Sequence, residues 1–374
     1  MELFTSKPPS FLGIDIGSTS IKVVELGIDQ GRPRLLTYGF SESKGDFIYK
    51  DSDKQLKETA ELIRKVMLEA KTISEKVITA LPSYSVFSSI LSFPLSITNK
   101  DLPSAIKWEA KKVIPLPLDE MSLSWNKLSE TVEKKEEKKK GGEKKDKKDK
   151  KIGFFKKANR IKRGSQKILL TGAPNSLVKK YVEIFKLANL KLVSLETESF
   201  ALVRSLIGND ASPAFIVNLG SVSSTITIVE NGIPVLNRSI DIGGKNVTTL
   251  IAKSLNVSEE RAAHFKQDVG LAESSEGTIS RMVEQALRPI VNEIRYTMNA
   301  WQNQTSGIIT KLVLTGGSSN LPNLSTFISN ELNIRAFLGD PWARVIYPED
   351  LKPVLNEVGS KLAVSIGLAM RNIV

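Results

Sequence analysis

The sequence predicts an α/β fold with mixed sheets, built as two related domains. Strand-like and helical runs alternate along nearly all of its 374 residues, which is the pattern of an α/β protein. A stretch near the N-terminus, GIDIGSTSIKVV, aligns with a second one, IVNLGSVSSTITI, and the two begin the two halves of the chain. A period of this length is not that of a solenoid. We therefore expect duplicated domains that face each other across a cleft.

The composition excludes several classes of site. The chain has no cysteine and one histidine, which disfavours disulfides, a cysteine nucleophile, a zinc site and a Ser-His-Asp triad. No apolar run approaches the length of a membrane-spanning helix, and the N-terminal MELFTSKPPS lacks the regions of a secretory signal. We therefore expect a soluble protein with a sizeable core and at least two domains, and the lack of cysteine is compatible with a reducing cytoplasm.

The first half of the chain begins with strands, and a helix with an apolar stripe follows them. Apolar alternation marks the strands, Pro94 closes the fourth of them, and the sequence IPLPL stops the second helix. The expected elements are strands at 11–27, interrupted in the middle by a glycine and hydroxyl residues, and at 33–41, a helix at 52–70, strands at 76–81 and 84–93, a helix at 100–113 and a strand near 121–130.

A basic stretch interrupts this pattern at residues 133–163. It carries 16 lysines and arginines against six acids, a surplus of ten within a formal net charge of +12 for the whole chain. Because it has almost no apolar content before Ile152, we expect a disordered insertion, which is most simply a solvated loop. A second interpretation is attraction to an anionic membrane surface through residues 150–163, where two phenylalanines lie among basic residues. Nucleic acid is not expected as a partner.

After the insertion the alternation of strands and helices resumes. The last helix is expected to end close to the C-terminus, after a glycine-rich turn and a further helix. The expected elements are strands at 167–173 and 191–196, helices at 176–190 and 198–207, strands at 213–219, 223–230 and 233–241, helices at 244–254, 258–269 and 278–303, a strand at 311–315, and helices near 321–332 and 358–371.

The repeated stretch contains a strand, a glycine and a tip of small hydroxyl residues. Glycine permits a tight turn, and serines or threonines at the tip leave successive backbone amides uncovered, so the tip can hold phosphate oxygens. Asp15 precedes Gly17 by two residues, at the end of a strand that otherwise reads as core. From there its carboxylate would reach a hydrated Mg²⁺ that bridges the phosphates. The alternative is that DIGS and NLGS are ordinary hairpin turns.

Two further glycine turns lie later in the chain, in SIDIGGKNVTTLI and LVLTGGSSNLPNL. Each leads from a strand end into a helix, and paired glycines allow a flat base to approach the backbone. Taken singly, each could be simple punctuation between two elements. The order of all four motifs along the chain is the more specific signal.

In this order the motifs resemble the actin/sugar kinase/Hsp70 superfamily, and within it the FtsA-like cell-division proteins and the PilM family of type IV pilus assembly proteins. The segments IKWEAKKVIPLPLDEMSLSW, IVNEIRYTMNAWQNQ and SIGLAMR favour the pilus family. The resemblance implies an actin-like duplicated ATPase fold, with two lobes around a nucleotide cleft and an FtsA-type small subdomain. The implied parts are a first lobe at 1–81 and 166–212, the small subdomain at 82–165, a second lobe at 213–357, and a C-terminal helix at 358–374 that returns to the first lobe.

The resemblance also implies ligands and partners. These are ATP or ADP with Mg²⁺ in the cleft, the cytoplasmic N-terminal tail of the bitopic membrane protein PilN, and the motor and platform proteins of the pilus. The protein would be cytoplasmic and peripheral at the inner membrane. The resemblance does not decide whether it forms a homo-oligomer. The residues implied for the nucleotide are Asp15, Gly17, Ser18, Thr19, Ser20 and Lys22 in the first phosphate loop, Gly220, Ser221 and Ser223 in the second, Gly243 and Gly244 beyond it, His264 and Lys266 near the ribose and base, and Gly316, Gly317 and Ser318 at the adenosine; those implied for the metal are Asp15, Glu198 and Asn218.

Two departures from the superfamily pattern affect the expected activity. Many relatives have aspartate where this chain has Asn218, and an amide cannot accept a proton from an attacking water. His264 replaces an acid expected to reach the ribose, although it could equally be an ordinary surface histidine. No catalytic residue is therefore assigned, and we expect weak or absent hydrolysis. Three hypotheses stay open: a nucleotide-gated adaptor, an active ATPase or phosphotransferase, and a filament-forming protein like FtsA.

Overall fold

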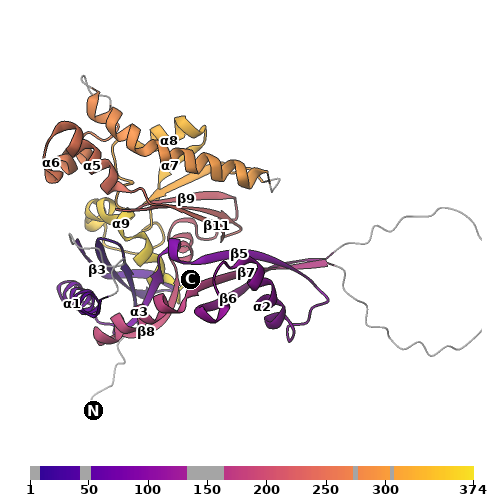
Figure 1. Ribbon diagram of the computed structural model, residues 1–374. Coiled ribbons are helices and arrows are strands. Elements are labelled where there is room, and N and C mark those ends of the chain that lie inside the picture. The colour runs from indigo at the N-terminus through magenta and orange to yellow at the C-terminus, as the bar shows by residue number, and fades with distance from the viewer. Residues whose placement is uncertain (1–8, 43–51, 133–163, 273–276, 304–306) are drawn as a thin grey trace, which may run out of the picture. The chain divides into compact units, whose positions relative to one another are not determined.

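The structure, a computed structural model, describes residues 9–42, 52–132, 164–272, 277–303 and 307–374. It is an α/β protein with two five-stranded sheets and one three-stranded sheet (Figure 1). The chain divides into a larger unit, Met1–Phe87 with Ala173–Val374, and a smaller unit, Ser88–Gly172. The basic stretch expected to be a disordered insertion lies outside the described residues.

The first sheet of the larger unit has the strand order β3-β2-β1-β4-β8. β1 pairs with β2, and β2 with β3, in antiparallel fashion, whereas β1 and β4, and β4 and β8, are parallel. Its strands are β1 (Phe11–Ile16), β2 (Ser20–Asp29), β3 (Arg32–Glu42), β4 (Lys76–Leu81) and β8 (Lys191–Thr197). The interrupted strand expected at 11–27 is thus the hairpin β1–β2.

The second sheet has the order β11-β10-β9-β12-β13 and repeats the same strand directions. Its strands are β9 (Ala214–Leu219), β10 (Ser224–Glu230), β11 (Ile233–Ile240), β12 (Lys311–Thr315) and β13 (Arg335–Leu338). Asp15 pairs with Lys22 in the first sheet, and Asn218 pairs with Thr225 in the second. The register therefore reproduces the sequence repeat residue by residue. β13 was not expected, because four residues are too few to show a period.

Helices cover the outer face of each sheet. On the first sheet these are α1 (Asp53–Glu69) and α3 (Asn175–Leu187), whose buried Ile63 and Phe185 pack against Leu12 and Ile14 of β1. On the second, the helices α5 (Gly244–Leu255), α6 (Glu259–Asp268), α7 (Thr278–Gln302) and α8 (Leu324–Leu332) belong to one apolar cluster with β9, β10 and β12. Each sheet thus has its own core.

Two helices pack between the sheets. α4 (Glu198–Leu202) continues into a π-helical turn, Val203–Ile207, and α9 (Lys352–Met370) follows a short turn, Glu349–Leu351. Their buried Ala201 and Val364 share an apolar cluster with Ile78 of the first sheet and Ile216 of the second. The final helix begins six residues earlier than the sequence pattern indicates, because Pro353 occupies a position in its first turn that proline tolerates.

The crossing of α4 and α9 leaves no room for a side chain. A Cβ added to Gly367 would lie 1.9 Å from the carbonyl oxygen of Ala201, and one added to Gly13 would lie 2.2 Å from that of Ser365. These two glycines let the backbones of α4, α9 and β1 pack directly against one another.

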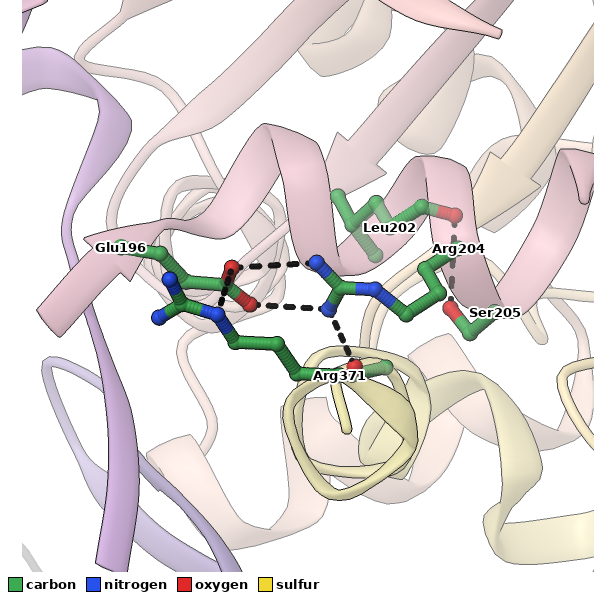
Figure 2. A network of polar contacts seen from close by, with 6 residues as sticks. Glu196, Leu202, Arg204, Ser205 and Arg371 are labelled. Atoms are coloured by element: carbon green, nitrogen blue, oxygen red, sulfur yellow. Dashed lines mark hydrogen bonds and ion pairs between the residues drawn. The ribbon is translucent and has the colours of Figure 1, made fainter. Parts of the chain in front are cut away.

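A charged network fixes the same crossing at its edge (Figure 2). The guanidinium of Arg204 donates to both carboxylate oxygens of Glu196 at 2.9 and 3.0 Å, and also to the carbonyl of Gly367. Arg371 lies 3.7 Å from the same carboxylate. Because these side chains are largely buried, the paired carboxylate ties the C-terminus of α9 to β8 and to the π-helical turn.

The described residues of the smaller unit form a three-stranded sheet and one α-helix. Its strand order is β5-β7-β6, with β5 (Phe87–Pro94), β6 (Met121–Val132) and β7 (Gly164–Pro174), and a short turn at Leu118–Glu120 precedes β6. The helix α2 (Leu102–Val113) buries one stripe, formed by Leu102, Ile106 and Ala110. Within the described part of the chain, no helix is long and apolar enough to cross a membrane.

The crossing of α4 and α9 predicts a strong packing defect in Gly367→Ala. The added methyl group overlaps the Ala201 carbonyl, so backbone must move, and we expect the free energy of unfolding to fall by about 3 kcal/mol. Urea denaturation measures this change. Gly317→Ala is the matched control, since the nearest atom to its Cβ is 3.7 Å away. Equal stability of the two variants would contradict this account of the crossing.

Candidate functional site

A cavity of about 600 Å³ lies within the larger unit, where the β1–β2 and β9–β10 hairpins meet. Both hairpin turns line it, together with the glycine turn after β12 and one face of α6. The sequence-predicted residues that line it are Asp15, Gly17, Ser18, Thr19, Ser20, Lys22, Glu198, Asn218, Gly220, Ser221, Ser223, Gly244, Lys266, Gly316, Gly317 and Ser318. Segments 300 residues apart in the chain therefore converge on one cavity.

The two hairpin turns have the same backbone geometry. The amide of Gly17 donates to the carbonyl of Ser20 at 2.9 Å, and the amide of Gly220 donates to that of Ser223 at 3.0 Å. In the described structure, the two residues between these partners donate no backbone hydrogen bond in either turn. Each tip therefore presents two adjacent amides that are available to an anion.

Three charged side chains lie behind the first tip. Asp15, at the end of β1, is 4% exposed, and its carboxylate is 2.8 Å from the ammonium of Lys22 on the paired strand. Glu198 begins α4 and lines the same cavity. Removal from bulk water, and then repulsion by Asp15, raise the pKa of Glu198 to about 7, although hydrogen bonds from Ser83 and the charge of Lys22 lower it. The two carboxylates therefore line the same cavity and repel each other.

Backbone hydrogen bonds join the second tip to the two later glycine turns. The carbonyls of Gly220 and Ser221 accept from the amides of Gly244 and Lys245 at 2.9 and 2.8 Å. The carbonyl of Leu219 accepts from the amide of Ser318 at 3.1 Å. These bonds fix three of the sequence motifs relative to one another.

Gly316 shows why this junction needs glycine. Its φ is +91°, and a Cβ there would lie 2.5 Å from both the Asn218 side-chain oxygen and the Leu219 carbonyl. Only glycine combines this backbone conformation with so close an approach. Asn218 is thereby placed at the cavity wall beside the glycine turn.

Two predicted nucleotide contacts do not line the cavity. Gly243 precedes α5, and a Cβ on it would lie 2.5 Å from the carbonyl of Ser221, so its role in this structure is close packing behind the second tip. His264 is exposed on α6. The face of α6 toward the cavity carries Ala263 instead, one residue earlier, so the geometry gives no support to His264 as a ribose contact.

Several cavity residues were missed by the sequence interpretation. On α6 they are Glu259, Glu260, Ala263 and Gln267, and elsewhere they include Phe40, Lys245, Thr248, Ser360 and Lys361. The residues on α6 recur at helical spacing, so a helical-face analysis around Lys266 would have found them. Lys361 lies over the ring of Phe40, with its ammonium 5.6 Å from the ring centre. No local signal in α9 identifies that lysine.

The metal-binding capacity of the cavity is limited. Nowhere in the described ranges do three or more His, Cys, Asp or Glu side chains gather in a way that could hold a metal ion. Asp15 and Glu198 provide two carboxylates and Asn218 provides an amide oxygen. That set fits Mg²⁺ only in the mode where ligand phosphates and water complete the coordination.

Comparison of this sequence with the profiles of known protein families identifies its family. The profile described as "Type IV pilus assembly protein PilM" matches residues 13–162 and 154–373. The chain belongs to this family. The match covers both lobes and the smaller unit, so the family resemblance deduced from the motifs is confirmed.

Solved structures with the same fold are found by comparison with this chain. One, a PilM-PilN type IV pilus biogenesis complex, has 22% sequence identity and a TM-score of 0.77, with 97% of this chain and 98% of that chain covered. Another, the ethanolamine utilization protein EutJ from Carboxydothermus hydrogenoformans, has 14% identity and a TM-score of 0.54, with 97% and 90% covered. The expected two-lobed actin-like fold is confirmed.

The raised pKa of Glu198 predicts a specific pH dependence of stability. Between pH 4.5 and about 7 the folded chain keeps a proton on Glu198 that the unfolded chain has lost. The free energy of unfolding of the wild type therefore falls as pH rises through this window. Glu198→Gln removes this term, so we expect the variant to gain on the wild type from pH 5 to pH 8, by at most about 2 kcal/mol because water reaches the cavity.

Urea denaturation at several pH values measures the difference. Glu61→Gln, an exposed change on α1, is the control and should follow the wild-type curve. Parallel curves for wild type and Glu198→Gln would show that the Glu198 carboxyl titrates normally.

Proposed function

We propose that this protein is a nucleotide-binding adaptor of the type IV pilus inner-membrane assembly machinery. It binds ATP or ADP with Mg²⁺ in the cavity and holds the cytoplasmic N-terminal tail of PilN, as a cytoplasmic protein peripheral to the inner membrane. The observation that carries the nucleotide part is the pair of matching hairpin turns, which both line one cavity and which each have two backbone amides without a hydrogen bond in the described structure. One such turn is common, but two that converge fit a chain of phosphates.

The charges of the cavity wall support a polyphosphate ligand. Lys22 lies beside the first tip, and Lys245, Lys266 and Lys361 also line the cavity. Lys266 is oriented by the Gly244 carbonyl at 3.2 Å and the Thr248 hydroxyl at 3.0 Å. In a concave site, these cations attract phosphate groups more strongly than they would on an open surface.

Mg²⁺ bound with the nucleotide would neutralise the phosphates and hold them in one arrangement. Asp15 and Glu198 would orient its water ligands from the first lobe, and the Asn218 amide would face them from the second. The glycine turn at Gly316 and Gly317 would accept a base, and Lys266 and the acids of α6, which line the same cavity, would lie toward the ribose. Gly243 and His264 are left out of this assignment because neither lines the cavity.

The cavity favours binding over turnover. An attacking water needs an acceptor for its proton, and the amide of Asn218 cannot act as one. Asp15 is already paired with Lys22 at 2.8 Å. We therefore propose that the nucleotide acts mainly as a ligand that selects one arrangement of the lobes, and that hydrolysis is slow or absent.

The partner assignment rests on family membership. The chain belongs to the PilM family, and a solved structure similar over 97% of the chain is described as a PilM-PilN complex. The proposal also includes attraction of residues 150–163 to anionic lipid. These residues lie outside the described part of the structure.

A peptide titration with and without ATP is the experiment that tests this function. We expect a synthetic N-terminal tail of the same organism's PilN to bind, with an affinity that changes at least about fivefold when saturating Mg-ATP is added. The reason is that the nucleotide and the peptide favour the same arrangement of the chain. Isothermal titration calorimetry measures both ligands on the full chain.

Asp15→Asn is the matched variant, and Asp29→Asn, an exposed change on β2, is its control. Asp15→Asn should weaken Mg-ATP binding about tenfold or more and leave peptide binding without nucleotide close to wild type. A wild-type chain that binds neither ligand would refute the adaptor. A fast, Asp15-dependent release of phosphate would favour an enzyme instead.

A further inference from the structure

Ser83 lies at the point where the chain leaves the cavity for the smaller unit. It is 6% exposed and begins a single 3-10 turn, Ser83–Ser85, directly after β4. Its neighbours Pro82 and Tyr84 both line the cavity, and β5 begins at Phe87. Ser83 therefore precedes β5, the first strand of the smaller unit, by only four residues, so a change in its backbone occurs close to that strand.

The hydroxyl of Ser83 has two acceptors within reach. It lies 3.2 Å from Oε2 of Glu198 and 3.3 Å from Oγ of Ser199, and the Ser83 amide also donates to Glu198 Oε2, at 3.3 Å. A serine has one hydroxyl proton, so it serves one of these acceptors at a time. Ser83 therefore has two alternative acceptors, and it lies between two residues that line the cavity.

Ser199 is tied to the second lobe. Its hydroxyl donates to Oδ1 of Asn237 on β11 at 2.8 Å, and Thr227 on β10 donates to the same oxygen at 2.8 Å. Because its own proton is engaged, Ser199 can meet Ser83 only as an acceptor. The path from Glu198 through Ser83 and Ser199 to Asn237 thus links the cavity to both lobes.

We propose that Ser83 couples the state of the cavity to the smaller unit and to the second lobe. The inference rests on the proposed function, and it names the residue through which nucleotide and partner binding influence each other. When a ligand in the cavity draws the Glu198 carboxylate toward itself, Ser83 loses that acceptor and turns its proton to Ser199. The hydrogen bonds that close the 3-10 turn, from the Ser85 amide to Pro82 and from the Val86 amide to Ser83, then change just before β5 begins at Phe87. Ser83 is a positioning residue, because it acts through Glu198 and the turn.

The test is a double titration of the full chain with Mg-ATP and the PilN tail peptide, in wild type and Ser83→Ala. The quantity measured is the ratio of peptide dissociation constants without and with nucleotide, which linkage makes the same for either order of addition. We expect at least about a fivefold ratio in the wild type and less than about twofold in Ser83→Ala. Ser199→Ala, which removes the second acceptor, should give the same loss.

Ser85→Ala is the matched control, because it lies in the same turn and its hydroxyl makes no hydrogen bond among the described residues. It should keep the wild-type ratio. Hydrogen exchange gives a second readout: nucleotide should change protection of the Ser85 and Val86 amides, which close this turn, in wild type but not in Ser83→Ala.

The outcomes separate the two claims. A wild-type chain that binds both ligands, with a ratio that Ser83→Ala leaves unchanged, would overturn the role of Ser83 and leave the adaptor standing. A wild-type ratio of one would also overturn it. A chain that binds no nucleotide would overturn the proposed function itself. If Ser83→Ala is unstable, Ser199→Ala decides the coupling.

Discussion

The geometry of the cavity depends on the hydrogen bonds that the backbone carbonyls of the second hairpin turn accept. The carbonyls of Leu219, Gly220 and Ser221 accept from amides at the start of α5 and in the turn after β12. Their engagement leaves the amides of the tip directed to the cavity. These amides have no hydrogen-bond partner in the described structure, so they are available to an anion in the cavity. The same bonds fix Asn218 and Gly316 against each other, and so determine the shape of the cavity wall.

The helical layer between the sheets gives the hairpins their common position. Gly13 and Gly367 allow β1, α9 and α4 to pack by backbone contact, and the Glu196–Arg204–Arg371 network holds the end of α9 (Figure 2). α9 also meets the second lobe, where the carbonyl of Ser360 accepts from the Gly316 amide at 2.9 Å. One helix therefore touches both walls of the cavity. A ligand that contacts both walls would therefore also contact α9, which packs against each lobe.

Local patterns predicted the parts of the fold that local physics determines. Alternation located the paired strands, and the sequence repeat predicted duplicated domains, whose hairpins the structure shows in the same register at Asp15 and at Asn218. The sequence could not show β13, which is four residues long, or the contribution of Lys361, which reaches the cavity only because α9 returns to it. Gly243 and His264 fall within recognisable motifs, but the start of α5 and the rotation of α6 turn them away from the cavity. Tertiary packing, rather than motif membership, decides which side of an element faces a ligand.

The central claim is that the two hairpin tips bind the same chain of phosphates. Amide hydrogen exchange on the full chain, with and without Mg-ATP, tests this most directly because it reads each tip separately. The account predicts that the amides of Ser18 and Thr19 and those of Ser221 and Val222 become protected together, at one nucleotide concentration. Protection of one tip alone, or of neither, would contradict it.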